Sequence, residues 1–191
     1  APLLANDAEV IYAFLDRHRG VFVELSDHES ETLIREGARS SSTRNRAEIA
    51  AEASTALERG HTATPVALGE STTLLFLGAL WINDALMLAA RAAHADGARI
   101  VALLYDLTPV LEGGHTAAVN KLFDRYLTLL FDTASRVPAI SSSSRADFEE
   151  YAGRHLRTAP PGDVSGLPCG LTPQGRDLTE RPWPRDYALF V

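Results

Sequence analysis

The sequence predicts an α/β fold, a Rossmann-like and mostly parallel sheet flanked by helices. Strand-like and helix-like segments alternate from Thr72 to Pro168, and that order favours parallel pairing with right-handed crossovers. Ile100–Leu104 is a near-continuous apolar run, which is typical of a strand buried on both faces of a parallel sheet. Pro109 follows shortly afterwards and prevents that strand from continuing.

The N-terminal part of the chain precedes this regular pattern. Two β-rich runs in Glu9–Leu25 surround the turn Asp16–Gly20, so we expect a β-hairpin with a loop of about five residues. Its tip carries Arg17–Arg19, which we expect to be exposed. Ser26–Ala38 predicts a short helix with Leu33 and Ile34 inward.

A second helix is expected over Arg44–Arg59, rich in Ala and Glu and stopped by Gly60. The strands expected after it are Thr72–Leu77, Arg99–Tyr105, Arg136–Ile140 and Val164–Pro168. The helices expected between them are Asn83–Ala95, Thr116–Thr133 and Ser142–Leu156.

Local capping residues support two of these helices. Asn83 or Asp84 fits the N-cap of the first, and Gly97 fits its C-terminal stop. In the last helix, Ser144 and Asp147 fit the Ser-x-x-acid capping pattern.

Composition bounds the class of protein. The chain has 191 residues, which suits one domain or one domain with part of another, and 46% of them are hydrophobic. Its formal net charge of −7 offers no basic excess to neutralise phosphates, which argues against a nucleic-acid or anionic-membrane surface. The single cysteine, Cys169, excludes an intramolecular disulfide.

The chain shows no signal peptide and no membrane-spanning apolar run. Thr72–Ile82 is too short to span a bilayer and is interrupted by Gly78. We therefore expect a cytoplasmic protein.

Polar side chains follow the expected strands where each one ends. Asn83 and Asp84 follow the first strand, Tyr105 and Asp106 the second, and Ser141 the third. Open α/β sheets bind ligands in the crevice at the carboxyl ends of their strands. Asp106 is therefore the leading catalytic candidate, and the other four residues are candidates for substrate binding.

Each candidate also has a purely structural interpretation. Asn83 and Asp84 would cap a helix, although a helix N-terminus that caps also binds anions. Asp106 would close an Asx-type turn, and Ser141 would cap the next helix, which is the favoured interpretation for that serine. Tyr105 would be a strand-end aromatic residue.

Other chemical signatures are absent. The sequence contains no P-loop, G-x-S-x-G elbow or kinase signature, and its six histidines lack metal-ligand spacing. We therefore expect neither a cofactor nor a metal site.

Several segments resemble family-4 retaining glycosyltransferases of the GT-B fold. LLYDLTPVL resembles that family's segment of a hydrophobic strand, His-Asp and Leu-Ile-Pro. TTLLFLGALWINDALMLAARAA fits the preceding strand, loop and helix, VPAISSSSRADFEEY fits a later serine segment, and SGLPCGLTP fits the interdomain stretch. Together these segments cover roughly Thr72–Val191 in the family's order.

The resemblance implies the N-terminal, acceptor-side domain of an enzyme that transfers a sugar from a nucleotide-sugar to a glycan or lipid-linked acceptor. Asp106 matches the family's Asp, and Asn83, Asp84 and Ser141 match its cleft loops. The nucleotide-sugar donor would bind through a missing C-terminal domain. The resemblance also implies peripheral membrane association of the full-length enzyme.

The chain departs from the family pattern at two kinds of place. Tyr105 replaces the usual His and Ser142 the usual Glu, and a tyrosine is a poorer proton acceptor near neutral pH. A first strand would precede Ala1, and its loss is expected to leave a gap or to rearrange the sheet. We therefore expect an acceptor-side domain over residues 1–170, a linker with the start of a donor domain over 171–191, and no activity in this fragment.

Two other functions remain open. A non-catalytic α/β binding or interaction module is favoured by Tyr105 and by the lack of a complete phosphate loop. A small hydrolase or phosphatase is the weaker alternative, because the chain has no nucleophile elbow and no Asp-rich metal site.

Overall fold

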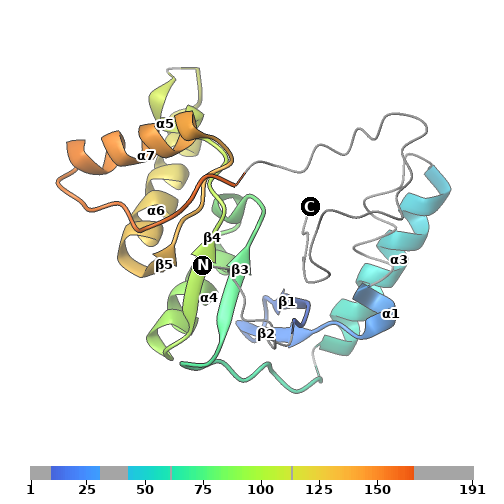
Figure 1. Ribbon diagram of the computed structural model, residues 1–191. Coiled ribbons are helices and arrows are strands. Elements are labelled where there is room, and N and C mark those ends of the chain that lie inside the picture. The colour runs from blue at the N-terminus through green and yellow to red at the C-terminus, as the bar shows by residue number, and fades with distance from the viewer. Residues whose placement is uncertain (1–9, 31–42, 61, 113, 166–191) are drawn as a thin grey trace, which may run out of the picture.

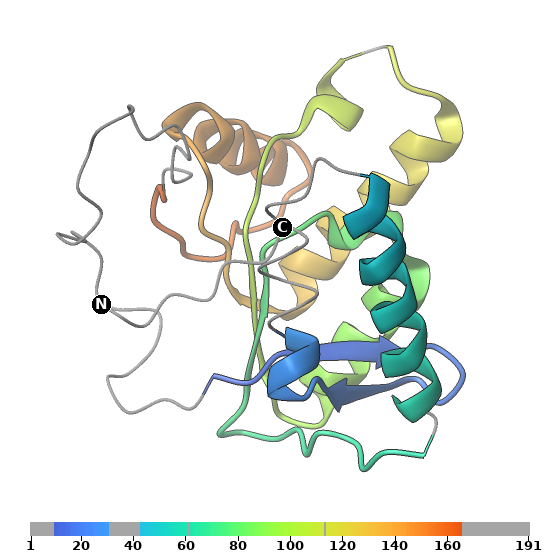
Figure 2. The same cartoon turned by 90° about the vertical axis from the view of Figure 1, so that its right-hand side faces the viewer.

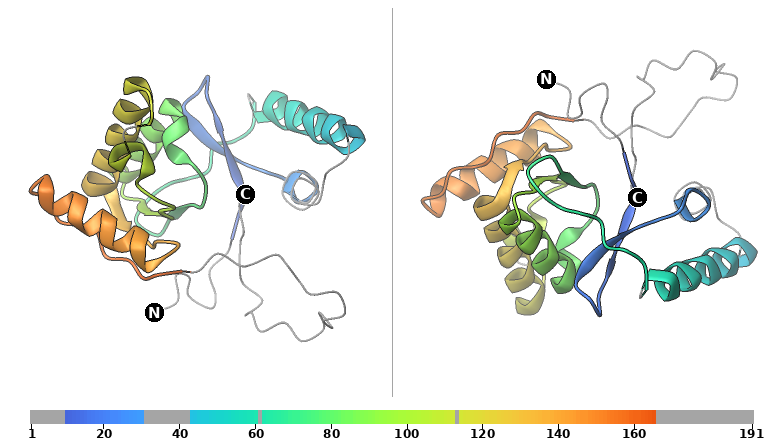
Figure 3. Two further views of the ribbon diagram at one scale, coloured as in Figure 1. Left: turned by 90° about the horizontal axis from the view of Figure 1, so that it is seen from above. Right: turned by 90° about the horizontal axis from the view of Figure 1, so that it is seen from below.

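The computed structural model describes residues 10–30, 43–60, 62–112 and 114–165 (Figure 1). It is a mixed α/β fold in which a three-stranded parallel sheet is flanked by helices, and a separate two-stranded hairpin precedes the sheet. The hairpin lies between the sheet and the pair α1 and α3 (Figures 1 and 3).

The hairpin prediction is confirmed. β1 (Ala13–Asp16) and β2 (Val21–Glu24) pair antiparallel. Gly20 supplies a positive φ of 68° in the turn, a conformation that costs glycine little. The Asp16 carboxylate accepts a hydrogen bond from the N–H of His18 at 3.0 Å, so the side chain helps to fix the turn.

The next helix begins where the sequence predicted. In α1 (Asp27–Ser30), the N–H of Ser26 donates to Glu29 Oε2 at 2.6 Å, and the N–H of Glu29 donates to Ser26 Oγ at 3.3 Å. This reciprocal pair is a capping box. The remainder of the predicted helix, with Leu33 and Ile34, lies outside the described residues.

The helix α3 (Thr43–Gly60) matches the second predicted helix and is bonded to the hairpin region by Arg59. The Arg59 guanidinium donates to both carboxylate oxygens of Glu29, at 2.9 and 2.7 Å, and to the Glu24 carbonyl at 2.8 Å. Glu29 is only 4% exposed. Its hydrogen bonds to Arg59 outweigh the opposing effect of burial and lower the pKa of Glu29 to about 2.

Arg19 makes a second bridge between the hairpin and α3. Its guanidinium donates to the carbonyls of Gly60 at 2.9 Å and Ala63 at 2.7 Å. The predicted exposure of the hairpin tip is confirmed, since Arg17, His18 and Arg19 are all exposed. The two hydrogen-bond partners of Arg19, more than forty residues further along the chain, were not predicted. A Cβ at Gly60 would overlap the Phe14 ring, so the close approach of helix and hairpin requires glycine there.

The parallel sheet consists of β3 (Thr73–Phe76), β4 (Arg99–Ala102) and β5 (Ala134–Arg136), in that order. Strands that are consecutive in sequence are neighbours in space, and no gap separates them among the described residues. The parallel pairing continues past the strand ends through isolated bridges from Leu104 to Ala139 and from Ala139 to Val164.

Two of the predicted strands differ from the structure in detail. The third begins at Ala134, earlier than predicted, and its register with β4 shifts between Ile100 and Val101. Only Val164 of the predicted fourth strand is paired, and residues 166–168 lie outside the described part. The predicted domain boundary at residue 170 also lies outside it.

Helices connect the strands. They are η2 (Leu80–Ile82), α4 (Asp84–Ala95), α5 (Thr108–Leu111), α6 (Ala117–Thr133) and α7 (Ser142–Arg154). The two short helices, η2 and α5, were not predicted. Pro109, expected only to stop a strand, lies in the first turn of α5, where its missing N–H costs no hydrogen bond.

The main core lies between the sheet and the helices α4 and α6. Its fully buried side chains include Leu104 from the β4 segment, Leu127 and Leu130 from α6, and Phe148 from α7. The Phe131 ring stacks on Phe148 with centroids 5.1 Å apart, so α7 packs against α6 (Figure 3).

The C-terminal end of α7 has an unusual residue. The N–H of Arg157 donates to the Ala152 carbonyl at 2.9 Å, and the N–H of Leu156 donates to the Gly153 carbonyl at 3.1 Å. These two bonds form a Schellman motif, which places Leu156 at φ 54°, where glycine is usual. The Leu156 side chain is 95% exposed.

Of the helices that the structure describes, none has the length and apolar character required to cross a membrane.

Candidate functional site

The carboxyl ends of the parallel strands meet at one edge of the sheet, and the predicted site residues follow those ends. β3 ends at Phe76, and the bridge between Leu104 and Ala139 extends the pairing beyond the ends of β4 and β5. Hydrogen bonds within this edge join Tyr105 to its neighbours on both sides.

Tyr105 connects the first two segments. Its hydroxyl donates to the main-chain carbonyl of Leu77 at 2.6 Å, across 28 positions of sequence. The residue is 36% exposed, so its ring is accessible to solvent at the edge. Because the Tyr105 hydroxyl donates its proton to the Leu77 carbonyl, the side chain connects the two segments and presents its ring as an apolar surface.

Ser144 connects the second and third segments. It is 6% exposed, and its hydroxyl donates to the Tyr105 carbonyl at 2.6 Å. The hydroxyl oxygens of Ser141 and Ser144 lie 2.9 Å apart. Since the only hydroxyl proton of Ser144 goes to Tyr105, Ser141 is the donor in that pair.

The cap of α7 is Ser141, as the structural interpretation of that serine predicted. Its Oγ accepts the N–H of Ser144 at 3.1 Å. The prediction that Ser144 caps this helix, with Asp147 as its acidic partner, was therefore wrong. The N-cap lies three residues before Ser144, and the Ser144 hydroxyl instead donates a hydrogen bond to the Tyr105 carbonyl.

Asp106 lies directly after Tyr105 and is exposed. Its Oδ1 accepts the N–H of Thr108 at 2.9 Å, which is the Asx-type turn predicted as the structural alternative. No described lysine, arginine or histidine forms an ion pair with Asp106, so Oδ2 remains available as an acceptor.

Asn83 makes the expected cap, whereas Asp84 makes an ion pair that was not predicted. Asn83 is the N-cap of α4, where its Oδ1 accepts the N–H of Leu86 at 3.3 Å. Asp84 is the first residue of α4, and its carboxylate forms an ion pair with Arg125 of α6 at 3.1 Å. The structure therefore links Tyr105 and Ser141 through Ser144, whereas no hydrogen bond joins Asp84 or Asp106 to that group.

Sequence reasoning missed Ser144 and Arg125. A run of four serines, Ser141–Ser144, gives no signal for which hydroxyl is turned inward. Arg125 lies 41 positions from Asp84, and only the packing of α4 against α6 brings them together. Within the described part of the chain, no three His, Cys, Asp or Glu side chains are grouped so as to hold a metal ion.

Comparisons of the chain with protein-family models, with curated proteins and with solved structures found no match.

Proposed function

We propose that the carboxyl edge of the sheet is the acceptor-binding side of a sugar-transferring enzyme and holds a glycan or lipid-linked acceptor at Asp106. One observation carries the proposal. Asp106 has one carboxylate oxygen fixed by the N–H of Thr108 and a second oxygen with no described cationic partner, at the carboxyl end of the middle strand. Ligands of open α/β sheets bind at that end.

The chemistry of such an acceptor suits these groups. A sugar hydroxyl donates well to an ionised carboxylate, and such a charge-assisted bond is stronger than a neutral one. The exposed part of the Tyr105 ring offers an apolar surface to the C–H face of a sugar ring. With its proton donated to Leu77, Tyr105 would position the acceptor and take no part in proton transfer.

The edge is also held in place, which a transfer reaction needs because reacting groups must be aligned before the barrier is crossed. The main chain before Asp106 is fixed by Ser144, and the main chain after it by the Asx turn. The side chain of Asp106 is thus oriented from both directions. In this proposal the chain supplies the acceptor side, and the donor nucleotide-sugar binds elsewhere in the full-length enzyme.

A second candidate function has an observation of its own. Four of the candidate side chains form hydrogen bonds with main-chain groups of this chain: Asn83, Tyr105, Asp106 and Ser141. A non-catalytic α/β binding or interaction module would require no more than that.

Titration of the ¹⁵N-labelled chain with neutral oligosaccharides and with nucleotide-sugars, followed by NMR, tests the proposal. We expect oligosaccharides to shift the amides of Tyr105 and Asp106, and Asp106→Asn to weaken that binding about ten-fold, since a charged acceptor is lost. Asn keeps the Oδ1 acceptor of the turn, so the fold is preserved. Glu112→Gln, which removes an exposed carboxylate after α5, is the matched control.

Two outcomes would contradict the proposal. If no oligosaccharide shifts these amides, or if Asp106→Asn binds as the parent does, the interaction module becomes the better description. Micromolar binding of a nucleotide-sugar to this chain would instead show that the donor site is not elsewhere.

A further inference from the structure

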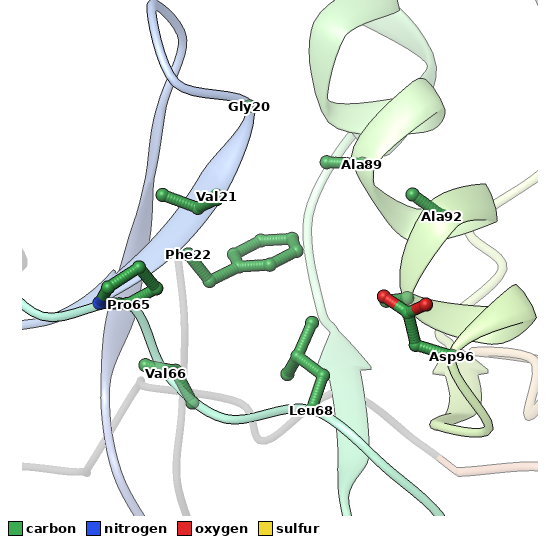
Figure 4. A pocket seen from close by; sticks show the side chains of 10 residues that line it. Gly20, Val21, Phe22, Pro65, Val66, Leu68, Ala89, Ala92 and Asp96 are labelled. Carbon is green, nitrogen blue, oxygen red and sulfur yellow. The ribbon is translucent and has the colours of Figure 1, made fainter.

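A pocket of about 150 Å³ lies between the hairpin and α4, away from the carboxyl edge (Figure 4). The helix α4 begins at the carboxyl edge with its N-cap Asn83 and runs back along the sheet to its C-cap Asp96. The pocket is lined by residues near the second of these ends, including Ala92, Ala93 and Asp96. It is therefore separate from the site around Asp106.

The walls of the pocket are apolar and come from three segments. Phe22 of β2 and Leu68 of the segment between α3 and β3 face the small side chains of Ala89 and Ala92 on α4 (Figure 4). Phe22 is only 6% exposed, and its ring packs against Phe76 with centroids 6.5 Å apart, so this wall is fixed by the core. The pocket is partly open to solvent, and its volume equals that of an enclosed apolar cavity that accepts a benzene molecule, so a body of about six carbons fits it.

The polar side of the pocket is negative. Asp96 lies across from Phe22 and Leu68 at the C-terminus of α4, where the helix dipole also favours a cation (Figure 4). No described cation forms an ion pair with Asp96.

We propose that this pocket binds a small organic ammonium ion with a compact apolar body of about six carbons. The apolar body would contact Phe22 and Leu68, and the ammonium group would lie at Asp96. Burial of the body supplies the affinity, whereas the unpaired carboxylate and the helix end supply the preference for positive charge. The inference is independent of sugar binding at Asp106.

Three ligands of one shape and different charge test the inference: cyclohexylammonium, cyclohexanol and cyclohexanecarboxylate. Each is titrated into the ¹⁵N-labelled intact chain and followed by NMR. We expect the first two to shift the amides of Phe22, Leu68 and Ala92, with the ammonium binding about three- to five-fold more tightly than the alcohol because of its exposed ion pair. The carboxylate should not bind, since Asp96 repels it.

Two variants separate the charge from the shape of the pocket. Asp96→Asn should remove the preference for ammonium and leave the dissociation constant of cyclohexanol unchanged. Ala92→Leu fills the pocket from an exposed helix position with a residue of good helix propensity, and should abolish binding of both ligands. Glu112→Gln removes a distant carboxylate and should change neither, and circular dichroism verifies that each variant is folded.

The inference is overturned by any of three results. These are the absence of amide shifts with cyclohexylammonium, equal affinity for ammonium and alcohol in the parent chain, and ammonium binding that survives Ala92→Leu in a folded variant. If Ala92→Leu does not fold, Asp96→Asn is the test: loss of the preference for ammonium over alcohol supports the inference, and an unchanged preference overturns it.

Discussion

The Ser144 hydroxyl donates a 2.6 Å hydrogen bond to the main-chain carbonyl of Tyr105, although the two residues are 39 positions apart. This bond joins the first turn of α7 to the end of the β4 segment. It also fixes the peptide unit that precedes Asp106, and so connects the stability of a helix start with the geometry of the candidate site.

Ser144→Ala is therefore expected to destabilise the chain by about 1–2 kcal/mol, because the Tyr105 carbonyl loses its buried donor. Urea unfolding of the parent and variant measures the difference. Ser143→Ala, at an exposed neighbour in the same serine run, should change stability by less than about 0.5 kcal/mol. Equal effects of the two substitutions would contradict the assigned role of Ser144.

The turn at Asp106 can be separated from its proposed binding role. Asp106→Asn retains an Oδ1 acceptor for the N–H of Thr108, so we expect its unfolding free energy to equal that of the parent within about 0.5 kcal/mol. Asp106→Ala loses the acceptor and should cost about 1 kcal/mol. If both variants are equally destabilised, the negative charge and not the hydrogen bond stabilises the turn.

Leu156→Gly is expected to stabilise the chain by about 1 kcal/mol, because a leucine at φ 54° is strained and its side chain, 95% exposed, gives little in return. Thermal unfolding measures the gain. Leu156→Ala is the matched control, since alanine keeps the strain and should leave the midpoint nearly unchanged. A lower midpoint for the glycine variant would contradict the strain.

Stability should depend on pH through Glu29. Its pKa is lowered in the folded chain from 4.5 to about 2 by the hydrogen bonds from Arg59, so the folded state favours the ionised form. That contribution is complete above pH 4.5 and is lost as the pH falls toward 2. The advantage of the parent over Glu29→Gln should shrink by about 2–3 kcal/mol across that window in urea unfolding, and a constant difference would contradict the coupling.

Gly162 and Gly153 should respond in opposite directions to alanine. A Cβ at Gly162 would overlap the carbonyl oxygen of Val137, so Gly162→Ala is expected to cost about 3 kcal/mol. Gly153 lies within α7 with open space around it, so Gly153→Ala should stabilise the chain by about 0.5–1 kcal/mol. Denaturant midpoints of the two variants measure both effects.

The elements that the sequence predicted well are those with long periodic patterns and caps at their ends. The helix α4 is an example, because Asn83 and Gly97 define it from both sides. The helix α5 was missed because its four residues are too few to show a period. The partners of Arg19 were missed for a different reason: they are main-chain carbonyls at and just after the end of α3, and a main-chain carbonyl has no sequence signal.

For the candidate site, the sequence predicted which residues lie at the carboxyl edge but not the hydrogen bonds between them. The alternation of strands and helices was enough to assign Tyr105 and Asp106 to the carboxyl edge, because that edge is fixed by the direction of parallel strands. The inward turn of Ser144 depends on the Tyr105 carbonyl, which only the assembled sheet brings within reach. Side-chain pairing across the edge is therefore a property of the packing.

Two arginines, Arg19 and Arg59, join the hairpin to α3 and couple the local opening of these elements. The hairpin lies beside the C-terminal end of α3 (Figure 2). Arg19 reaches from the hairpin to the end of α3, and Arg59 reaches from α3 back to Glu24 and Glu29. Neither the hairpin nor α3 separates from the other without breaking both. Cooperative units of this kind open together in amide hydrogen exchange. The amides of β1, β2 and α3 should therefore share one opening free energy, distinct from that of the parallel sheet.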